Sequence, residues 1–132
     1  VTLSPLGGSS AMLGLPGDAT SPSRFVRAAF LKATAPVQAT GFDTILQAFH
    51  LLNNFDVPIG IEHPAGQVPN MPSATQWTSA IDLTNGKVYY KTMYNNAIRC
   101  IDLTKIDFGN VAYQSHPLDK EQKQTIEHIL IR

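Results

Sequence analysis

Residues 77–103 alternate with a period of two and contain turn residues at regular places, and this pattern constrains the fold most strongly. From Trp77 onward, large apolar side chains alternate with small or polar ones, as in a strand with one buried face. Asn85-Gly86 follows, a pair typical of a type I′ turn, whose two central residues both need positive φ. We therefore predict an antiparallel meander of three strands. The expected strands are 77–83, 88–94 and 97–103, and Asn95-Asn96 is expected to form the second turn.

The part of the chain before this meander has the periodicity of amphipathic helices. Ser21 is the predicted N-cap of a first helix, with Pro22 at its first position and Pro36 beyond its end. A second helix is predicted to begin near Gly41–Asp43 and to end at Asn53-Asn54. Each helix has one apolar stripe, so each buries a single face. The predicted fold class is therefore α+β, a helical layer packed against an antiparallel sheet.

Three further segments have weaker patterns. Residues 56–73 contain four of the nine prolines and are predicted to form a long connector, of the kind that is often functional or wrapped on a surface. Residues 108–117 are predicted to add an edge strand. Residues 119–131 are predicted to form a helix with Asp119 near its start.

Composition limits the classes of function. The chain has 132 residues, the size of about one domain, and ten basic side chains balance ten acidic ones. Without a basic field, nucleic acid and anionic membranes are not expected as main partners. No apolar run approaches the ~20 residues of a membrane span. The first residue is Val1 and no signal-type segment follows, so we expect a processed chain or a piece of a longer one, with its location open between bacterial cytoplasm and periplasm.

Few residues indicate chemistry by themselves. No two of the four histidines are four residues apart, the spacing at which two histidines on a helix bind one metal ion. No cofactor-binding motif is present, so neither a metal nor a cofactor is expected. Residues 7–11 only faintly resemble a nucleophile elbow and are read as a flexible loop. Cys100, the single cysteine, is predicted to be a small buried strand residue without a catalytic role. Lys87, Lys91 and Arg99 are expected to be solvated or paired across strands.

Arg24 departs from the local rules of helix design. With Ser21 as N-cap, Arg24 stands at the third helical position, where a capping box has Glu or Gln. A cation is disfavoured there by the helix dipole, and Arg27 adds like-charge repulsion. Such a break can mark a functional residue. An ion pair of Arg24 or Arg27 with Asp18, or plain exposure, is the structural alternative.

Two blocks of sequence resemble the choloylglycine hydrolase family, which contains bile salt hydrolases and penicillin V acylases. The first block is Leu-Gly-Leu-Pro-Gly-Asp at 13–18 followed by Ser-Pro-Ser-Arg-Phe-Val-Arg-Ala-Ala-Phe at 21–30. The second includes Thr-Gln-Trp-Thr at 75–78, Tyr-Tyr-Lys-Thr at 89–92 and Asn-Asn-Ala-Ile-Arg at 95–99. The resemblance covers residues 11–105 or so, in the order of that family's C-terminal part.

The resemblance implies an N-terminal-nucleophile hydrolase with an αββα sandwich, of which residues 1–132 would be the C-terminal portion of a single domain. Such enzymes cleave linear amide C–N bonds with an N-terminal cysteine whose own α-amino group acts as base, through an acyl-enzyme. That cysteine, an early Arg and Asp, and the Asn oxyanion donors are expected before residue 1. Only the Arg of the Ser-Arg-Phe element carries over; it is Arg24, beside the nucleophile.

The implied substrates leave alternatives open. Conjugated bile salts are expected first, and penicillin V or acyl-homoserine lactones are the alternative. The alternative from another class of function is a non-catalytic fragment or scaffold, which would fold only with the missing half of the domain. The chain alone is predicted to be inactive. The resemblance also implies a small-molecule amide as partner and a homo-oligomer, often a tetramer.

Overall fold

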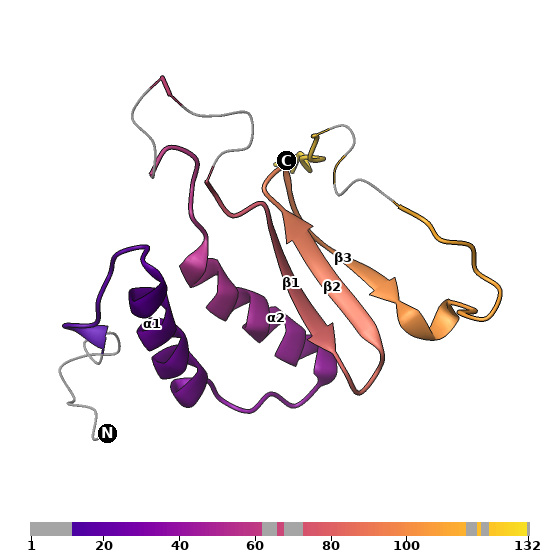
Figure 1. The fold of residues 1–132 in the computed structure, drawn as a ribbon, viewed down its shortest axis with the longest axis horizontal. Helices are drawn as coiled ribbons and strands as arrows, with labels where there is room; N and C mark the ends of the chain where they lie inside the picture. The colour runs from indigo at the N-terminus through magenta and orange to yellow at the C-terminus, as the bar shows by residue number, and fades with distance from the viewer. Residues whose placement is uncertain (1–11, 62–65, 68–72, 116–118, 120–121, 132) are drawn as a thin grey trace.

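The computed structural model describes residues 12–61, 66–67, 73–115, 119 and 122–131, and the structural statements below concern these residues. Two helices are followed by a three-stranded antiparallel sheet of order β1-β2-β3 (Figure 1). The predicted helical layer and meander are therefore present. The elements are α1 Ser21–Thr34, α2 Gly41–Leu52, the 3-10 turn η2 Asn53–Phe55, β1 Trp77–Asp82, β2 Lys87–Thr92, β3 Asn95–Asp102 and the 3-10 turn η3 Leu103–Lys105.

Helix α1 begins one residue earlier than the sequence predicts. Its N-cap is Thr20, with extended φ and ψ, so Ser21 is the first helical residue and Pro22 the second. Proline is favoured in this first turn because its missing N–H would have no partner there. The helix ends where the Ala35 N–H donates to the Leu31 carbonyl at 3.0 Å, just before Pro36.

Helix α2 has a reciprocal cap at its start. The Thr40 hydroxyl oxygen accepts from the Asp43 N–H at 3.1 Å and donates to the Asp43 carboxylate at 2.7 Å. These bonds satisfy one of the free N–H groups of the first turn and place a negative charge at the positive end of the helix dipole. The predicted start and end of this helix are confirmed, with η2 continuing the chain after Leu52.

Both turns of the meander differ from the prediction. Asp82 pairs with Lys87, so four residues connect β1 to β2. Only Gly86 in that loop has positive φ, at 61°, whereas the Asn85 amide binds the Asp82 carboxylate at 2.7 Å. The type I′ turn is therefore wrong, because the Asn85 side chain stabilises a longer loop. In the second turn Thr92 pairs with Asn95, so the turn lies at residues 93–94 and not at Asn95-Asn96.

Helix α2 and the segment after it lie against one face of the sheet, and α1 packs against α2 (Figure 1). The Asp82 carboxylate lies 3.7 Å from where a Cβ on Gly41 of α2 would stand, and the Lys91 ammonium lies 4.0 Å from the Asp56 carboxylate after α2. Because side chains alternate along a strand, Trp77 and Ile81 point to the opposite face, where they are 58% and 59% exposed. The buried apolar residues among those described are Ile45 and Phe49, both on α2.

Three predictions near the C-terminus and on β3 are wrong. Residues 108–115 form no strand, and 116–117 lie outside the described residues. Residues 122–131 form no helix; Gln122 has a φ of 50°, in the left-handed region that a right-handed helix excludes. Cys100 is exposed, because no described segment covers its position on β3. No helix in the described part of the chain is long and apolar enough to span a bilayer.

Candidate functional site

Arg24 and Arg27 meet in a hollow of about 200 Å³ at the start of α1. Its walls come from residues 17–19, from α1 and from residues 54–57 after α2. We call it the arginine hollow. Two segments 30 residues apart in sequence therefore form one site, which the sequence pattern did not indicate.

The loop before α1 is fixed by the Asp18 carboxylate. One oxygen accepts from the Thr20 N–H at 2.8 Å and the other accepts from the Ser23 hydroxyl at 2.6 Å. Ser23 is 7% exposed and stands at the third helical position. These bonds to the charged form lower the pKa of Asp18 to about 2, with the Ser23 hydrogen bond as the largest cause. Asp18 thus supplies the negative charge that the first turn of α1 itself lacks.

Arg27 ties the same loop to the helix. Its guanidinium donates to the Pro16 carbonyl at 2.7 Å and to the Asp18 carbonyl at 2.9 Å. It also lies over the Phe55 ring, 5.7 Å from the centroid, a cation–π contact. The alternative of an ion pair with the Asp18 carboxylate is not what forms: Arg27 binds the backbone oxygens of the loop. Arg27 therefore connects the loop, α1 and the segment after α2.

Arg24 lies in this framework without a comparable anchor. It is half-buried, and its guanidinium donates to the Ser21 hydroxyl at 3.3 Å. It occupies the fourth helical position, because Thr20 is the N-cap, and not the third as the sequence predicted. Among the described residues, no carboxylate lies within ion-pair distance of Arg24. Its cation is thus available in a hollow whose walls other residues hold in place.

Replacing Ser23 by alanine is expected to raise the pKa of Asp18 from about 2 toward its ordinary value of 3.8, because the largest stabilising bond to the carboxylate is lost. A depressed native pKa stabilises the fold above the unfolded value, and this contribution disappears as the pH falls toward the native pKa. A carboxyl NMR titration of wild type and Ser23→Ala measures the change. An unchanged Asp18 pKa would contradict the assigned cap.

A second hollow of about 470 Å³ adjoins the arginine hollow and shares Asp56 and Val57 with it. Its other walls are residues 58–59 and 74–75 and the β2–β3 turn region, from which Met93 and Asn96 contribute. We call it the turn hollow. The predicted long connector therefore provides a wall of both hollows through its first residues. Residues 62–65 and 68–72 of that connector lie outside the described part of the chain.

The other candidates from the sequence do not gather at this site. Cys100 lies on β3, and α2, β1 and β2 stand between that strand and α1 (Figure 1). His50 is exposed on α2. Within the described residues no group of three potential metal ligands occurs. Arg24 and Arg27 are thus the charged groups of the arginine hollow, together with Asp18 and Asp56.

Comparison with known proteins shows the family to which the chain belongs. The family model for linear amide C–N hydrolases of the choloylglycine hydrolase family matches residues 1–123. The chain belongs to the choloylglycine hydrolase family. A bile salt hydrolase/transferase of Clostridium perfringens is 36% identical over 119 residues, which are 90% of this chain and 35% of that protein. The chain therefore spans about a third of the length of this relative from the same family.

Solved structures of family members match the fold as well. A variant of the conjugated bile acid hydrolase from Clostridium perfringens superposes with a TM-score of 0.68 at 29% identity, covering 94% of this chain and 36% of that one. The penicillin V acylase from Agrobacterium tumefaciens superposes with a TM-score of 0.59 at 29% identity, covering 74% and 31%. The two helices and the three-stranded sheet thus match part of a bile acid hydrolase fold.

Proposed function

We propose that this chain is the C-terminal portion of an amide hydrolase domain that cleaves conjugated bile salts, and that Arg24 is its contribution to the catalytic site. Membership of the linear amide C–N hydrolase family supports the reaction class. The observation that carries the role of Arg24 is its place: a cation without a carboxylate partner among the described residues, in a hollow framed by Asp18 and Arg27.

In this proposal the nucleophile is an N-terminal cysteine supplied by the remainder of the domain. A fixed guanidinium beside it favours the thiolate, which is the attacking form of a cysteine. The thiolate attacks the amide carbonyl, and the protonated α-amino group of the cysteine gives its proton to the amine as the C–N bond breaks. Water then attacks the acyl-enzyme, losing its proton to the same α-amine, and releases the acid. No cofactor takes part in this sequence. The small-molecule amide is the partner, and a homo-oligomer remains part of the proposal.

Two substrate classes compete, and the comparisons support each to a different extent. Bile salts are supported by the 36% identity to a bile salt hydrolase/transferase and by the fuller structural match to a bile acid hydrolase. Penicillin V is supported by the match to a penicillin V acylase, which covers 74% of this chain. The bile salt proposal comes first, because its structural match extends over more of the chain and has the higher TM-score.

The substrate class is tested with the complete enzyme on a panel of glycine- and taurine-conjugated bile acids, penicillin V and an acyl-homoserine lactone. Release of amine or amino acid is followed at equal enzyme concentration. We expect kcat/KM for the best conjugated bile acid to exceed that for penicillin V by about tenfold or more, a difference of ~1.4 kcal/mol. The reverse order would select the penicillin acylase alternative, and no turnover of any amide would refute both.

A further inference from the structure

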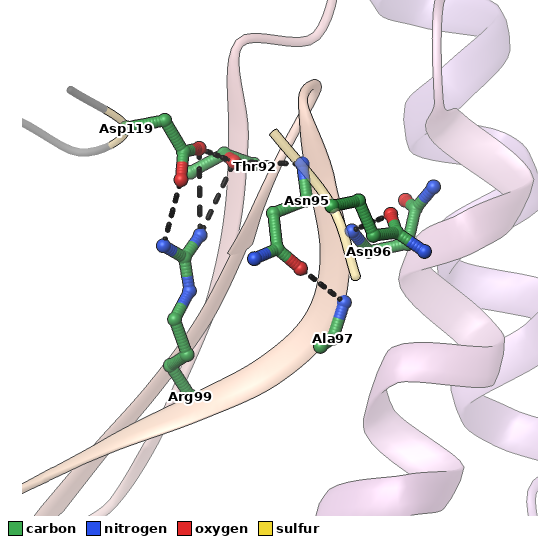
Figure 2. A network of polar contacts seen from close by, with 7 residues as sticks. Thr92, Asn95, Asn96, Ala97, Arg99 and Asp119 are labelled. Atoms are coloured by element: carbon green, nitrogen blue, oxygen red, sulfur yellow. Dashed lines mark hydrogen bonds and ion pairs between the residues drawn. The ribbon is translucent and has the colours of Figure 1, made fainter. Parts of the chain in front are cut away.

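A carboxylate from the C-terminal region enters a polar network on the sheet (Figure 2). Arg99 donates from Nη1 to one oxygen of Asp119 at 2.8 Å and from Nη2 to the other at 3.5 Å. The Thr92 hydroxyl bonds the same carboxylate and accepts from Arg99 Nη2 at 3.1 Å. The side chain of Asp119 is 9% exposed, and Thr92 is 5% exposed. The network is therefore largely shielded from water.

This network is prearranged by the sheet. Arg99 stands opposite Tyr90 in the β2–β3 register, and its guanidinium lies over the Tyr90 ring, 4.6 Å from the centroid. The stacking holds the planar group in place, so that it meets the carboxylate with both amino groups. Removing one member of a shielded charge pair leaves the other uncompensated, which is costly. Asp119 is thus held at a defined place on the sheet.

The same contacts define the turn between β2 and β3. The Thr92 hydroxyl, which binds Asp119, accepts from the Asn95 N–H at 3.2 Å. Gln124, five residues beyond Asp119, accepts from the Asn96 N–H at 2.7 Å through its side-chain oxygen. The β2–β3 pairing shifts register between Tyr90 and Thr92, so the strand ladder is interrupted just before the turn. Residues 119 and 124 therefore hold the turn at two points.

This turn borders the turn hollow. Met93 and Asn96 line it from one side, and Asp56 and Val57, which also line the arginine hollow, line it from another. Met93 is itself held by its N–H, which donates to the Gln76 carbonyl at 3.0 Å. A shift of the turn would therefore change the width of the turn hollow, which shares Asp56 and Val57 with the arginine hollow.

We infer that Asp119 is a positioning residue: through Arg99 and Thr92 it fixes the β2–β3 turn, and the turn sets the wall of the hollow that receives the part of an amide substrate remote from the scissile bond. The inference rests on the proposed function, because it treats the turn hollow as part of a substrate site. In this inference Asp119 does not contact the reacting atoms. Its loss should change substrate binding more than the chemical step.

The test compares Asp119→Ala, Arg99→Ala and the double variant of the complete enzyme with wild type. KM and kcat are measured with the best substrate of the panel, and amide hydrogen exchange is measured at residues 93–97. Asp107→Ala is the matched control, because the Asp107 carboxylate binds Gly109 and Asn110 within its own loop.

We expect KM to rise about five- to tenfold in Asp119→Ala with kcat within about threefold of wild type. The double variant should be no worse than the poorer single one, since both remove the same contact. Amide exchange at Asn95 and Asn96 should become about tenfold faster or more. Asp107→Ala should match wild type in KM and in exchange at the turn.

Three results would overturn the inference. These are an unchanged KM with a lowered Tm, which indicates a merely structural role; a loss of kcat without a change in KM; and unchanged exchange at Asn95 and Asn96. If the wild-type enzyme cleaves no amide on the panel, the proposed function fails. The exchange data then still decide whether Asp119 positions the turn.

Discussion

Arg24→Ala in the complete enzyme is expected to lower turnover of the best substrate by about 10²- to 10³-fold, the range seen when one fixed electrostatic group is removed from a catalytic site. The reason is that Arg24 places a cation in the arginine hollow, next to the expected position of the nucleophile, and no carboxylate of the described residues forms an ion pair with it. Without it the thiol keeps an ordinary pKa and is protonated for more of the time. Activity is measured as kcat and kcat/KM at fixed pH.

The fold should survive this substitution. The described side-chain bond of Arg24 is the 3.3 Å contact with the exposed Ser21, and such exposed contacts contribute little to stability. Circular dichroism and Tm should therefore remain close to wild type.

Arg24→Lys should restore little activity, because an ammonium is a point charge and lacks the planar fork of a guanidinium. Lys32→Ala, which removes a cation from the last turn of the same helix, is the matched control. Near-full activity of Arg24→Ala would refute its catalytic role.

A polypeptide of residues 1–132 alone is expected to show no amidase activity. Its first residue is valine, which has an α-amine but no nucleophilic side chain. Its single cysteine, Cys100, lies on β3, with α2, β1 and β2 between that strand and the helix of Arg24. Conjugated bile acids and penicillin V are assayed at high polypeptide concentration. Turnover that scales with this concentration would contradict the proposed mechanism, and its loss in Cys100→Ala would identify Cys100 as the nucleophile.

The same polypeptide is expected to associate with itself. The sheet face opposite the helices exposes Trp77, Ile81 and Ile101, the last at 44%. Contiguous exposed apolar surface and open strand edges promote association. Light scattering or gel filtration measures it, with the complete enzyme, in which this face is expected to be covered, as the control. A stable monomer of residues 1–132 at high concentration would contradict the expectation that this exposed face drives association.

The local elements could be predicted well because their signals are short-range. The periods of 3.6 and 2, the prolines beside helix ends and the polar caps act within a few residues, and α2 and the three strands were located within a few positions. The turns were less well predicted. The side chain of Asn85 binds the Asp82 carboxylate, and the backbone of Asn85 does not have the positive φ of a type I′ turn. Side-chain hydrogen bonds of this kind compete with regular turn geometry, and an Asn-Gly pair does not reveal them.

The site was predicted only in part. Arg24 was selected from a broken local rule and a family motif, whereas the part of Arg27 was underestimated. Its partners are carbonyls 9 and 11 residues away and a ring on a different segment. Backbone oxygens are present at every position, so no sequence pattern identifies which of them an arginine binds. The cation three residues after Arg24 was a signal, and it was interpreted as repulsion or as an ion pair with the Asp18 carboxylate.

By itself the sequence determined the order of two helices and three antiparallel strands up to the end of β3, and the family, because periodicity and motifs are properties of neighbouring residues. The tertiary structure alone decided which distant groups meet. It brought residues 54–57 to the start of α1 and Asp119 to Arg99, although the sequence placed Asp119 at the start of a helix. The physical reason is that Thr92 and Arg99 lie 27 and 20 residues before Asp119, so their charge-assisted hydrogen bonds to its carboxylate act over a separation that no local pattern records.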